Sequence, residues 1–541
     1  MTLSAPPEAD DVERPGRSSR PRFRRRIPPV AVSALVGLLG ALVAWELRTV
    51  PVPTDPWHYV EAGLTFPDAS WNTVGLTRYG MILPMMLVTR LFGMSEMAFY
   101  LPPVLASGVL VGALHWLGVR FFGQVAAVAG VVVVMANSVV LINASRAYPD
   151  VFAVSMTAVA VALAVAARDR WRRDERVRSR LVLLLAGVGA FVGLSWWMRE
   201  TAVFAWPVVA AVLLWRGGPP WRVVLPVAGG VAAGFLAVEM LIGQLAFGDP
   251  MVRFEALSGA DLSQTTNAAD LPYLNQGRLD YLAVIPRTAL LFADGHVMIV
   301  LAVLAVLGGV LAPRTVGVFA GWFLLVALAF VAIGGALRPG SPNIRLDVSR
   351  YWVAFLPPMA MAATGAVAAL VARLGPRVAA GWAGRTRALA AVGIACLLTA
   401  VPVLTSATEV RRQPTFVVVN HDTMSPFRNW LAAHDRGVDR IFAERDTERI
   451  LDVYTRSLTG RPMSHVRFRS LNGHLTIRPG DHVVVFSAHD MTCTFCNANV
   501  NAWLDEHPGI LDRWRRVWTS PDRRFEVYRV PRSAGRERLA G

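Results

Sequence analysis

Four polar side chains follow the first long apolar run of the chain. The segment T-D-P-W-H-Y-V-E-A-G (54–63) contains Asp55, His58, Tyr59 and Glu61. A carboxylate within hydrogen-bond reach of a hydroxyl can remove its proton in a transfer reaction. We therefore take Asp55 as the candidate general base and His58 and Tyr59 as candidate substrate-binding residues. A solvated polar loop is the alternative for each of them.

Three other segments place acids and arginines at the same kind of boundary. They are N-A-S-R-A-Y-P-D with Arg146, Tyr148 and Asp150, W-W-M-R-E-T with Arg199 and Glu200, and L-D-V-S-R-Y-W with Arg350 and Tyr351. Ionisable residues at membrane depth are costly and usually face a polar cavity or a partner. Arginine pairs phosphate oxygens in a fixed fork. A base together with phosphate-binding arginines is what a transferase that uses a lipid phosphate needs.

The elements that must position these residues are membrane spans. Of the 541 residues, 54% are hydrophobic, and apolar runs of roughly 17–25 residues, long enough to cross a bilayer, recur up to about residue 408. The formal net charge is +16. The basic residues lie mostly between apolar runs, where they orient helices, so we do not expect nucleic-acid binding.

The chain is predicted to be an α-helical polytopic membrane protein with about eleven spans. We place them at 29–48, 99–120, 124–142, 149–167, 181–197, 201–215, 223–245, 296–312, 317–335, 351–372 and 388–408. The Arg-rich loops 168–180, 215–222, 312–315 and 372–387 then share one side, which the positive-inside rule makes cytoplasmic. Residues 1–28 become a disordered basic cytoplasmic tail, and loops 49–98 and 246–295 lie outside. Segment 81–93 is apolar but too short to cross, so we expect it in the interface.

Residues 409–541 are more polar and are predicted to form an extracytoplasmic α/β domain. Expected strands are 415–420, 440–443, 482–487 and 525–530, with a helix at 425–434. The C-T-F-C segment contributes Cys493 and Cys496, which we expect to form a local disulfide in an oxidising compartment. Redox catalysis by this pair is the alternative.

The segments, taken in order, resemble the GT-C superfamily of polyprenyl-phosphate-sugar-dependent glycosyltransferases. The similarity is to the branch of the protein O-mannosyltransferases and the lipid A aminoarabinose transferase, and it covers about residues 30–370. The matching pieces are D-P-W-H-Y, the stretch R-Y-G-M-I-L-P-M-M-L-V-T-R-L-F-G-M-S-E-M-A-F-Y-L-P-P, V-R-F-F-G, S-R-A-Y-P-D, G-L-S-W-W-M-R-E and R-Y-W-V-A-F-L-P-P.

This resemblance implies a role for each partner and for both acids. The donor would be a polyprenyl-phosphate sugar, the acceptor a glycan, lipid or protein, and the site would lie on the outer face of a bacterial plasma membrane. Asp55 would be the general base and Asp150 a second active-site acid. Pro56 replaces the second acid of an Asp-Glu pair, which makes a protein acceptor less expected, and Arg199 replaces a lysine.

A divalent metal is left open. Asp55, His58 and Asp150 are ligands of suitable type, but their spacing is no metal signature. A multi-pass transporter or lipid flippase is the rival function, and it predicts charged residues in the span centres; Glu239 is one candidate. A non-catalytic scaffold is a third. No nucleotide-binding glycine loop occurs, which disfavours ATP-driven transport.

Overall fold

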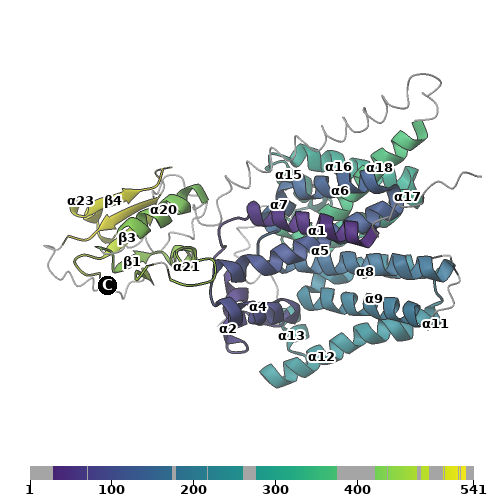
Figure 1. The fold of residues 1–541 in the computed structure, drawn as a ribbon, viewed down its shortest axis with the longest axis horizontal. Coiled ribbons are helices and arrows are strands. Elements are labelled where there is room, and N and C mark those ends of the chain that lie inside the picture. The colour runs from purple at the N-terminus through teal and green to yellow at the C-terminus, as the bar shows by residue number, and fades with distance from the viewer. Residues whose placement is uncertain are drawn as a thin grey trace, which may run out of the picture.

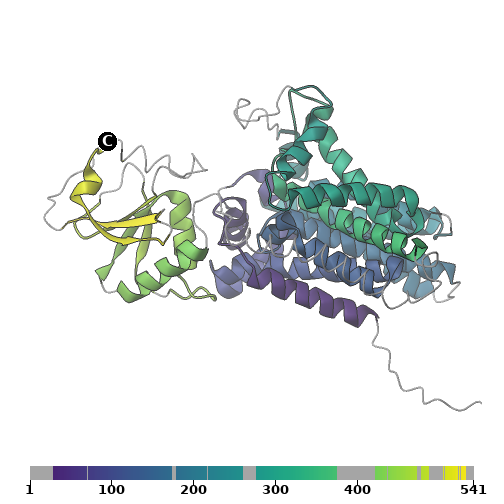
Figure 2. The same ribbon diagram turned by 90° about the horizontal axis from the view of Figure 1, so that it is seen from above.

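The computed structural model has a helical domain with a smaller α/β domain at one end (Figures 1 and 2). It describes residues 29–69, 71–173, 178–215, 217–259, 276–374, 421–434, 437–462, 464–471, 477–486, 504, 506–521, 523 and 525–531. The expected tail 1–28, span 388–408, strand 415–420 and cysteines Cys493 and Cys496 lie outside these residues. So do the expected domain boundary at residue 408 and part of loop 246–295.

Six helical segments within the described residues are long and apolar enough to cross a membrane. They are α5 (Glu96–Phe122), α8 (Pro149–Arg172), α9 (Arg178–Met198), the continuous run α11–η2–α12 (Trp221–Val224, Leu225–Gly229, Gly230–Phe247), α17 with η4 (Pro313–Val331, Ala332–Ala336) and α18 (Leu356–Leu374). The chain is therefore a polytopic α-helical membrane protein, as predicted.

Shorter apolar segments fill the remaining positions of the bundle. They are α1 (Pro29–Glu46), α6 (Gln124–Ala136) with α7 (Ser138–Asn143), η1 (Glu200–Ala205) with α10 (Trp206–Leu214), and α16 (Gly295–Leu311). Asn137 separates α6 from α7 because its side chain accepts the Val140 N–H and so begins a new helix. Helices now account for every expected span except the one outside the described residues.

The described parts of the Arg-rich connections lie at the end of the bundle where Figure 1 labels α11. Arg172 Nε donates to the Gly217 carbonyl at 3.3 Å, and Arg373 Nη2 donates to the Leu311 carbonyl at 2.7 Å. The opposite end holds α2 (Asp55–Thr65), α3 (Thr73–Leu76), α4 (Tyr79–Phe92), α13 (Val252–Gly259), α15 (Tyr281–Ala289) and η5 (Ser349–Ala354). The segments that carry the candidate site residues meet at this second end.

Helix α4 corresponds to the predicted interfacial segment 81–93. Its buried face contains Met81, Ile82 and Met85 and packs against α2, α5 and α9. Leu83, Leu87 and Leu91 form a stripe on its exposed face. An apolar stripe left uncovered by protein suits contact with lipid, so these leucines support the interfacial position that the sequence predicts.

The C-terminal domain is built on one five-stranded sheet with the order β2-β1-β3-β5-β4. The strands are β1 (Arg440–Ala443), β2 (Arg467–Ser470), β3 (His482–Phe486), β4 (Arg515–Thr519) and β5 (Phe525–Arg529). The first three are parallel, and β5 is antiparallel to β3 and β4. Helices α20 (His421–His434), α21 (Arg445–Tyr454) and α23 (Ile510–Arg513) accompany it. The predicted strands β1, β3 and β5 and helix α20 are confirmed.

The sequence prediction missed β2 and β4. Both begin with arginines, R-F-R-S and R-R-V-W-T, and only Phe468 of β2 is fully buried. A run of this kind lacks the alternation of apolar residues by which a half-buried strand is recognised. These two strands form the two edges of the sheet, where charged residues are common.

Candidate active site

Asp55 is the first residue of α2 and lies at the end of the bundle nearest the C-terminal domain. Pro56 follows it within the first turn, where a proline costs no helical hydrogen bond. The Asp55 Oδ2 atom pairs with Arg350 Nη1 at 2.5 Å, and the two side chains are 32% and 23% exposed. This pair joins two segments far apart in the chain and remains open to a ligand.

Positive charge surrounds the Asp55 carboxylate. Burial alone would raise its pKa, but the charge and hydrogen bond of Arg350, with further attraction from Arg78 and Arg199, outweigh burial. The pKa of Asp55 therefore lies below its ordinary value. The carboxylate is ionised at neutral pH, which is the form that a general base requires.

Aromatic rings hold two of the arginines that act on Asp55, Arg350 and Arg199. The Arg350 guanidinium lies over the Tyr148 ring at 4.7 Å and over the Tyr351 ring at 5.0 Å. Its Nη2 donates to the Tyr351 hydroxyl at 3.3 Å. Arg199 lies over the Tyr351 ring at 4.4 Å. Tyr351 thus has a cation near it from two different elements, and stacking fixes both guanidinium planes.

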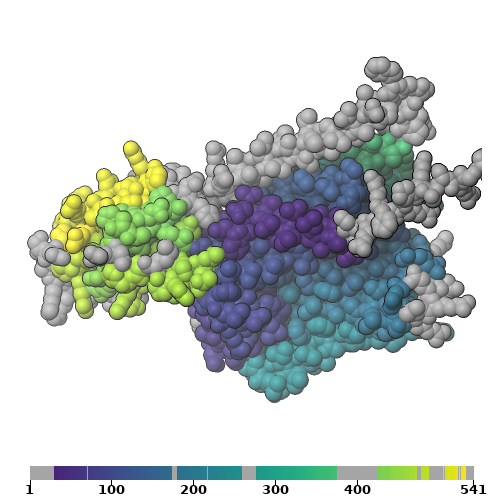
Figure 3. All heavy atoms as spheres, in the orientation of Figure 1, coloured from purple at the N-terminus to yellow at the C-terminus, as the bar shows by residue number. Residues whose placement is uncertain are grey.

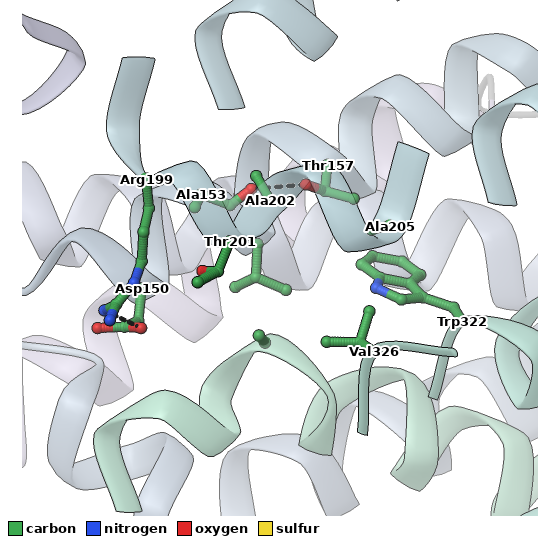
Figure 4. A pocket seen from close by; sticks show the side chains of 11 residues that line it. Asp150, Ala153, Thr157, Arg199, Thr201, Ala202, Ala205, Trp322 and Val326 are labelled. Carbon is green, nitrogen blue, oxygen red and sulfur yellow. Dashed lines mark hydrogen bonds and ion pairs between the residues drawn. The ribbon is translucent and has the colours of Figure 1, made fainter. Parts of the chain in front are cut away.

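Asp150 forms the second carboxylate–arginine pair of the site, with Arg199. Here the side chains are only 1% and 6% exposed. Beside the pair is a cavity of about 20 Å³ lined by Thr157, Thr201, Trp322 and others (Figure 4), which is room for one water molecule. Asp150 is therefore placed to hold Arg199 and is shielded from any large substrate.

A third arginine, Arg78, connects the loop before α4 to η1. Its Nη1 donates to the Tyr59 hydroxyl at 2.7 Å, and its Nη2 pairs with Glu200 Oε1 at 2.8 Å. This geometry depends on close packing of α4 on α9: a Cβ on Gly80 would come within 2.6 Å of Met198 Sδ and 3.0 Å of its backbone nitrogen. Gly80 therefore permits the contact that brings Arg78 to Glu200.

The network continues through Arg253, whose side chain is 2% exposed. Arg253 pairs with Glu239 at 3.3 Å and lies 3.6 Å from Glu200. It also donates to the Trp196 carbonyl at 2.7 Å and lies over the Trp196 ring at 4.6 Å. The Trp196 indole N–H in turn donates to Glu239 at 2.7 Å. Glu239 is thus a paired acid within α12 and contacts the site network.

Comparison with solved structures identifies the fold. The chain matches the crystal structure of ArnT from Cupriavidus metallidurans bound to undecaprenyl phosphate with a TM-score of 0.50 and 13% sequence identity, over 95% of this chain and 99% of ArnT. The apo structure of ArnT matches equally well, over 95% and 98%. The chain has the GT-C fold.

Other comparisons add less. AglB, an oligosaccharyltransferase from the archaeon Archaeoglobus fulgidus in complex with an inhibitory peptide and a dolichol-phosphate, matches with a TM-score of 0.44 and 12% identity, over 80% of this chain and 64% of AglB. No model of a known protein family matches the sequence, and no curated protein sequence matches it.

Within this GT-C fold, His58 and Arg146, both candidate binding residues from the sequence, make their hydrogen bonds outside the two carboxylate–arginine pairs. His58 pairs with Glu61 at 3.2 Å and stacks on Trp71. Arg146 donates to the Thr49 hydroxyl at 3.1 Å. The hydrogen bonds of His58 and Arg146 therefore support the local loop structure, whereas Tyr148, Arg199, Arg350 and Tyr351 gather around the two acids. Tyr59 and Glu200 reach the site through Arg78.

The C-terminal domain adds a residue that the sequence did not single out. Arg449 of α21 donates to the Pro53 carbonyl at 3.1 Å and lies over the Trp57 ring at 5.3 Å. Burial, followed by the nearby charge of Arg449, lowers the pKa of His58 below its ordinary value. The start of the Asp55 helix is thus fixed from two domains at once. Space-filling atoms show that the two domains are in contact (Figure 3).

The described side chains do not fit a metal centre. Nowhere in the described part of the chain do three His, Cys, Asp or Glu side chains come together as metal ligands. Asp55 and Asp150 each have an arginine paired with one carboxylate oxygen. Positive side chains beside a metal position oppose binding, so the arrangement favours an anionic ligand.

Proposed function

We propose that the chain is an integral-membrane glycosyltransferase that takes a sugar from a polyprenyl-phosphate donor. The acceptor would be a cell-envelope glycan, a glycolipid or a protein. The observation that carries the proposal is the open Asp55–Arg350 pair at 2.5 Å, an ionised carboxylate beside a cation. The fold shared with ArnT, one structure of which holds undecaprenyl phosphate, supports the lipid-linked donor.

Three arginines supply the positive charge that a phosphodiester needs. Arg350, Arg199 and Arg78 all lie close enough to lower the pKa of Asp55. Arg350 is the most accessible of the three, with 23% of its side chain exposed against 6% and 12%. Arg350 is therefore the phosphate ligand in this proposal, and Arg199 and Arg78 add attraction from behind.

In the proposed reaction the donor phosphate takes the place of Asp55 as the partner of Arg350. The freed Asp55 carboxylate then accepts the proton of the acceptor hydroxyl. The acceptor oxygen attacks the anomeric carbon, the bond from that carbon to the phosphate oxygen breaks, and polyprenyl phosphate leaves with the electron pair. Attack opposite the leaving group inverts the anomeric configuration. Arg350 stabilises the negative charge that grows on the departing phosphate.

Asp150 has a positioning role in this proposal. It is 1% exposed on its side chain and paired with Arg199, so it contacts no acceptor. Arg199 in turn supports Tyr351 and, through that ring, Arg350. Tyr59 and Glu200 act in the same way on Arg78.

The proposed site faces the extracytoplasmic side of a bacterial plasma membrane. The Arg-rich loops lie at the other end of the bundle, and such loops are typically cytoplasmic. The N-terminus would then be cytoplasmic and the α/β domain outside. The exposed leucine stripe of α4 lies at the interface in this orientation, next to the lipid tail of an arriving donor.

Purified protein in nanodiscs, given a panel of polyprenyl-phosphate hexoses and pentoses together with acceptor glycans, tests the proposal. We expect one donor to release free polyprenyl phosphate in step with transfer, with inverted configuration in the product. If no donor on the panel is consumed with any acceptor, or if the sugar crosses the bilayer intact, the transferase proposal is wrong. The second result would favour the transporter.

A further inference from the structure

A second polar cavity, of about 440 Å³, lies in the C-terminal domain. It lies between the last turn of α21 and the edge strand β2, and its volume suits a small ligand such as one or two sugar units. The lining is mainly polar and comprises Asp452, Thr455, Arg456, Pro462, Ser464, His465, Val466, Arg467, Phe468 and Arg469. None of these residues belongs to the candidate active site.

The cavity carries unbalanced positive charge. Arg467 and Arg469 lie two residues apart on β2 and are exposed, while Phe468 between them is buried. Neither guanidinium has a hydrogen bond or ion pair within the described residues. The acid of the lining, Asp452, is already bound by Arg456 through contacts at 2.8 and 2.9 Å. Among the described residues, Arg467 thus has no charged side-chain partner, and Arg469 has only the attraction of Glu448 on α21. Both can bind a ligand from outside.

Contacts to the membrane domain fix the wall of this cavity. Arg428 pairs with Glu96 at the start of α5 and donates to the carbonyls of Tyr454 at 2.5 Å and Arg456 at 3.2 Å. The Met97 backbone N–H donates to a further carbonyl of the same segment, that of Leu458, at 3.1 Å. A wall tied in this way is formed before a ligand arrives, which reduces the entropy lost on binding.

Helix α21 also connects the cavity to the Asp55 helix. Its residue Arg449 contacts Trp57, two residues after Asp55. Asp452 of the cavity lies three positions further along α21, which is about one helical turn or 5 Å. Figure 1 shows α21 on the side of the C-terminal domain nearest the bundle. The cavity and the start of the Asp55 helix therefore contact the same helix, about one turn apart.

We propose that this cavity binds a negatively charged group of the acceptor, a phosphate or a carboxylate, and so selects anionic acceptors. That the bound group belongs to an acceptor rests on the proposed glycosyltransferase function. The binding of an oxyanion in the cavity does not depend on that function. Arginine forms paired, charge-assisted hydrogen bonds with both groups, and Arg467 and Arg469 supply them here. Anionic phospholipid headgroups carry the same chemistry, so the experiment separates the two sources.

The test uses the full chain in nanodiscs of zwitterionic lipid. Binding of pyrophosphate, of a uronic-acid disaccharide and of the matching neutral disaccharide is measured by calorimetry. The variant is Arg467→Gln with Arg469→Gln. Its matched control is Arg515→Gln with Arg516→Gln, which removes the same charge from β4 at the opposite edge of the sheet. Exposed substitutions of this kind change stability little, and unfolding curves check this.

We expect both charged probes to bind equally well to wild type and the control, and the neutral disaccharide to bind to neither. The β2 variant should bind the charged probes at least about tenfold more weakly, because loss of even one charge-assisted contact has an effect of this size. In turnover with an anionic acceptor, the acceptor KM should rise in the β2 variant while kcat and the donor KM do not. Equal probe binding by the β2 variant and wild type overturns the inference. Aggregation of that variant without a change in binding also overturns it, because the arginines would then serve to prevent association at the exposed edge of the sheet.

Three further outcomes separate the hypotheses. If nanodiscs of anionic phospholipid abolish probe binding by wild type, the occupant is a headgroup and the acceptor assignment is wrong. If the probes bind but no donor is consumed, the cavity stands as an oxyanion site and the glycosyltransferase proposal fails. If donors are consumed but no charged probe binds, the glycosyltransferase proposal stands and the proposed oxyanion site is wrong.

Discussion

Replacement of Asp150 by asparagine should destabilise the protein through Arg199. The substitution preserves the shape of the side chain and removes its charge. Arg199, only 6% exposed on its side chain, would keep a buried charge without its partner. The same change made at Asp169, at the other end of α8, is the matched control because its partner Arg120 is 51% exposed.

The expected sizes differ because burial differs. Removal of one partner from a buried ion pair costs about 3–5 kcal/mol, whereas an exposed pair contributes about 0–1 kcal/mol. Asp150→Asn should therefore lower the unfolding free energy by several kcal/mol and Asp169→Asn by less than about 1 kcal/mol. Adding Arg199→Met to Asp150→Asn removes the stranded charge. The double variant should recover part of the lost stability, with a coupling of roughly 0.5–3 kcal/mol, but no activity.

Unfolding of wild type, Asp150→Asn, Arg199→Met and the double variant in mixed micelles, followed by tryptophan fluorescence, gives the four free energies of this cycle. Polyprenyl phosphate release gives the activities. The reasoning fails if Asp150→Asn is as stable as Asp169→Asn while turnover is abolished. In that case Asp150 would act on the substrate directly and its pairing with Arg199 would be incidental.

Three further predictions concern the same end of the bundle. Because Arg350 opposes the effect of burial on Asp55, Arg350→Gln should raise the Asp55 pKa and move the acidic limb of the kcat/KM profile to higher pH. The control Arg345→Gln removes an arginine that is paired with Asp347, and it should leave this limb unchanged. An unmoved limb in Arg350→Gln would contradict the base assignment. Arg449→Ala should raise the His58 pKa toward its ordinary value because a nearby positive charge is lost, and an NMR titration that shows no change would refute the contact between α21 and α2. Gly80→Ala should lower the free energy of unfolding by about 1–3 kcal/mol and lower activity, because it moves Arg78 away from Glu200. The control Gly234→Ala, where a Cβ meets no atom within 4 Å, should change neither quantity. Equal stability of the two variants would contradict the close packing of α4 on α9.

The sequence singled out residues that the structure brings together, because ionisable residues at the ends of apolar runs are rare and costly. Asp55, Asp150, Arg199 and Arg350 were all recognised in this way. Their pairing was not predictable: Asp55 and Arg350 are 295 residues apart, and nothing local tells which arginine reaches which acid. The pairing changed the interpretation of Asp150, which is closed off by Arg199 instead of facing an acceptor.

Other residues were missed for a different reason. Arg253 lies in a polar loop segment where a solvated arginine is the ordinary expectation, yet its side chain is 2% exposed. Arg78 lies within a recognised motif, but only its contacts to Tyr59 and Glu200 show its importance. Arg449 belongs to a separate domain whose docking depends on surface complementarity. Tertiary packing determines the contacts of all three arginines, and a pattern along the sequence does not indicate these contacts.

The most direct test of the account is release of polyprenyl phosphate by wild type, Asp55→Asn and Asp68→Asn in nanodiscs, with the donor and acceptor that wild type uses. Asp68 is an exposed carboxylate on the same outer segment and makes no contact with the arginines of the site among the described residues. The account predicts that Asp55→Asn still binds donor but loses turnover by several orders of magnitude, and that Asp68→Asn matches wild type. Full turnover by a folded Asp55→Asn variant would contradict the central claim.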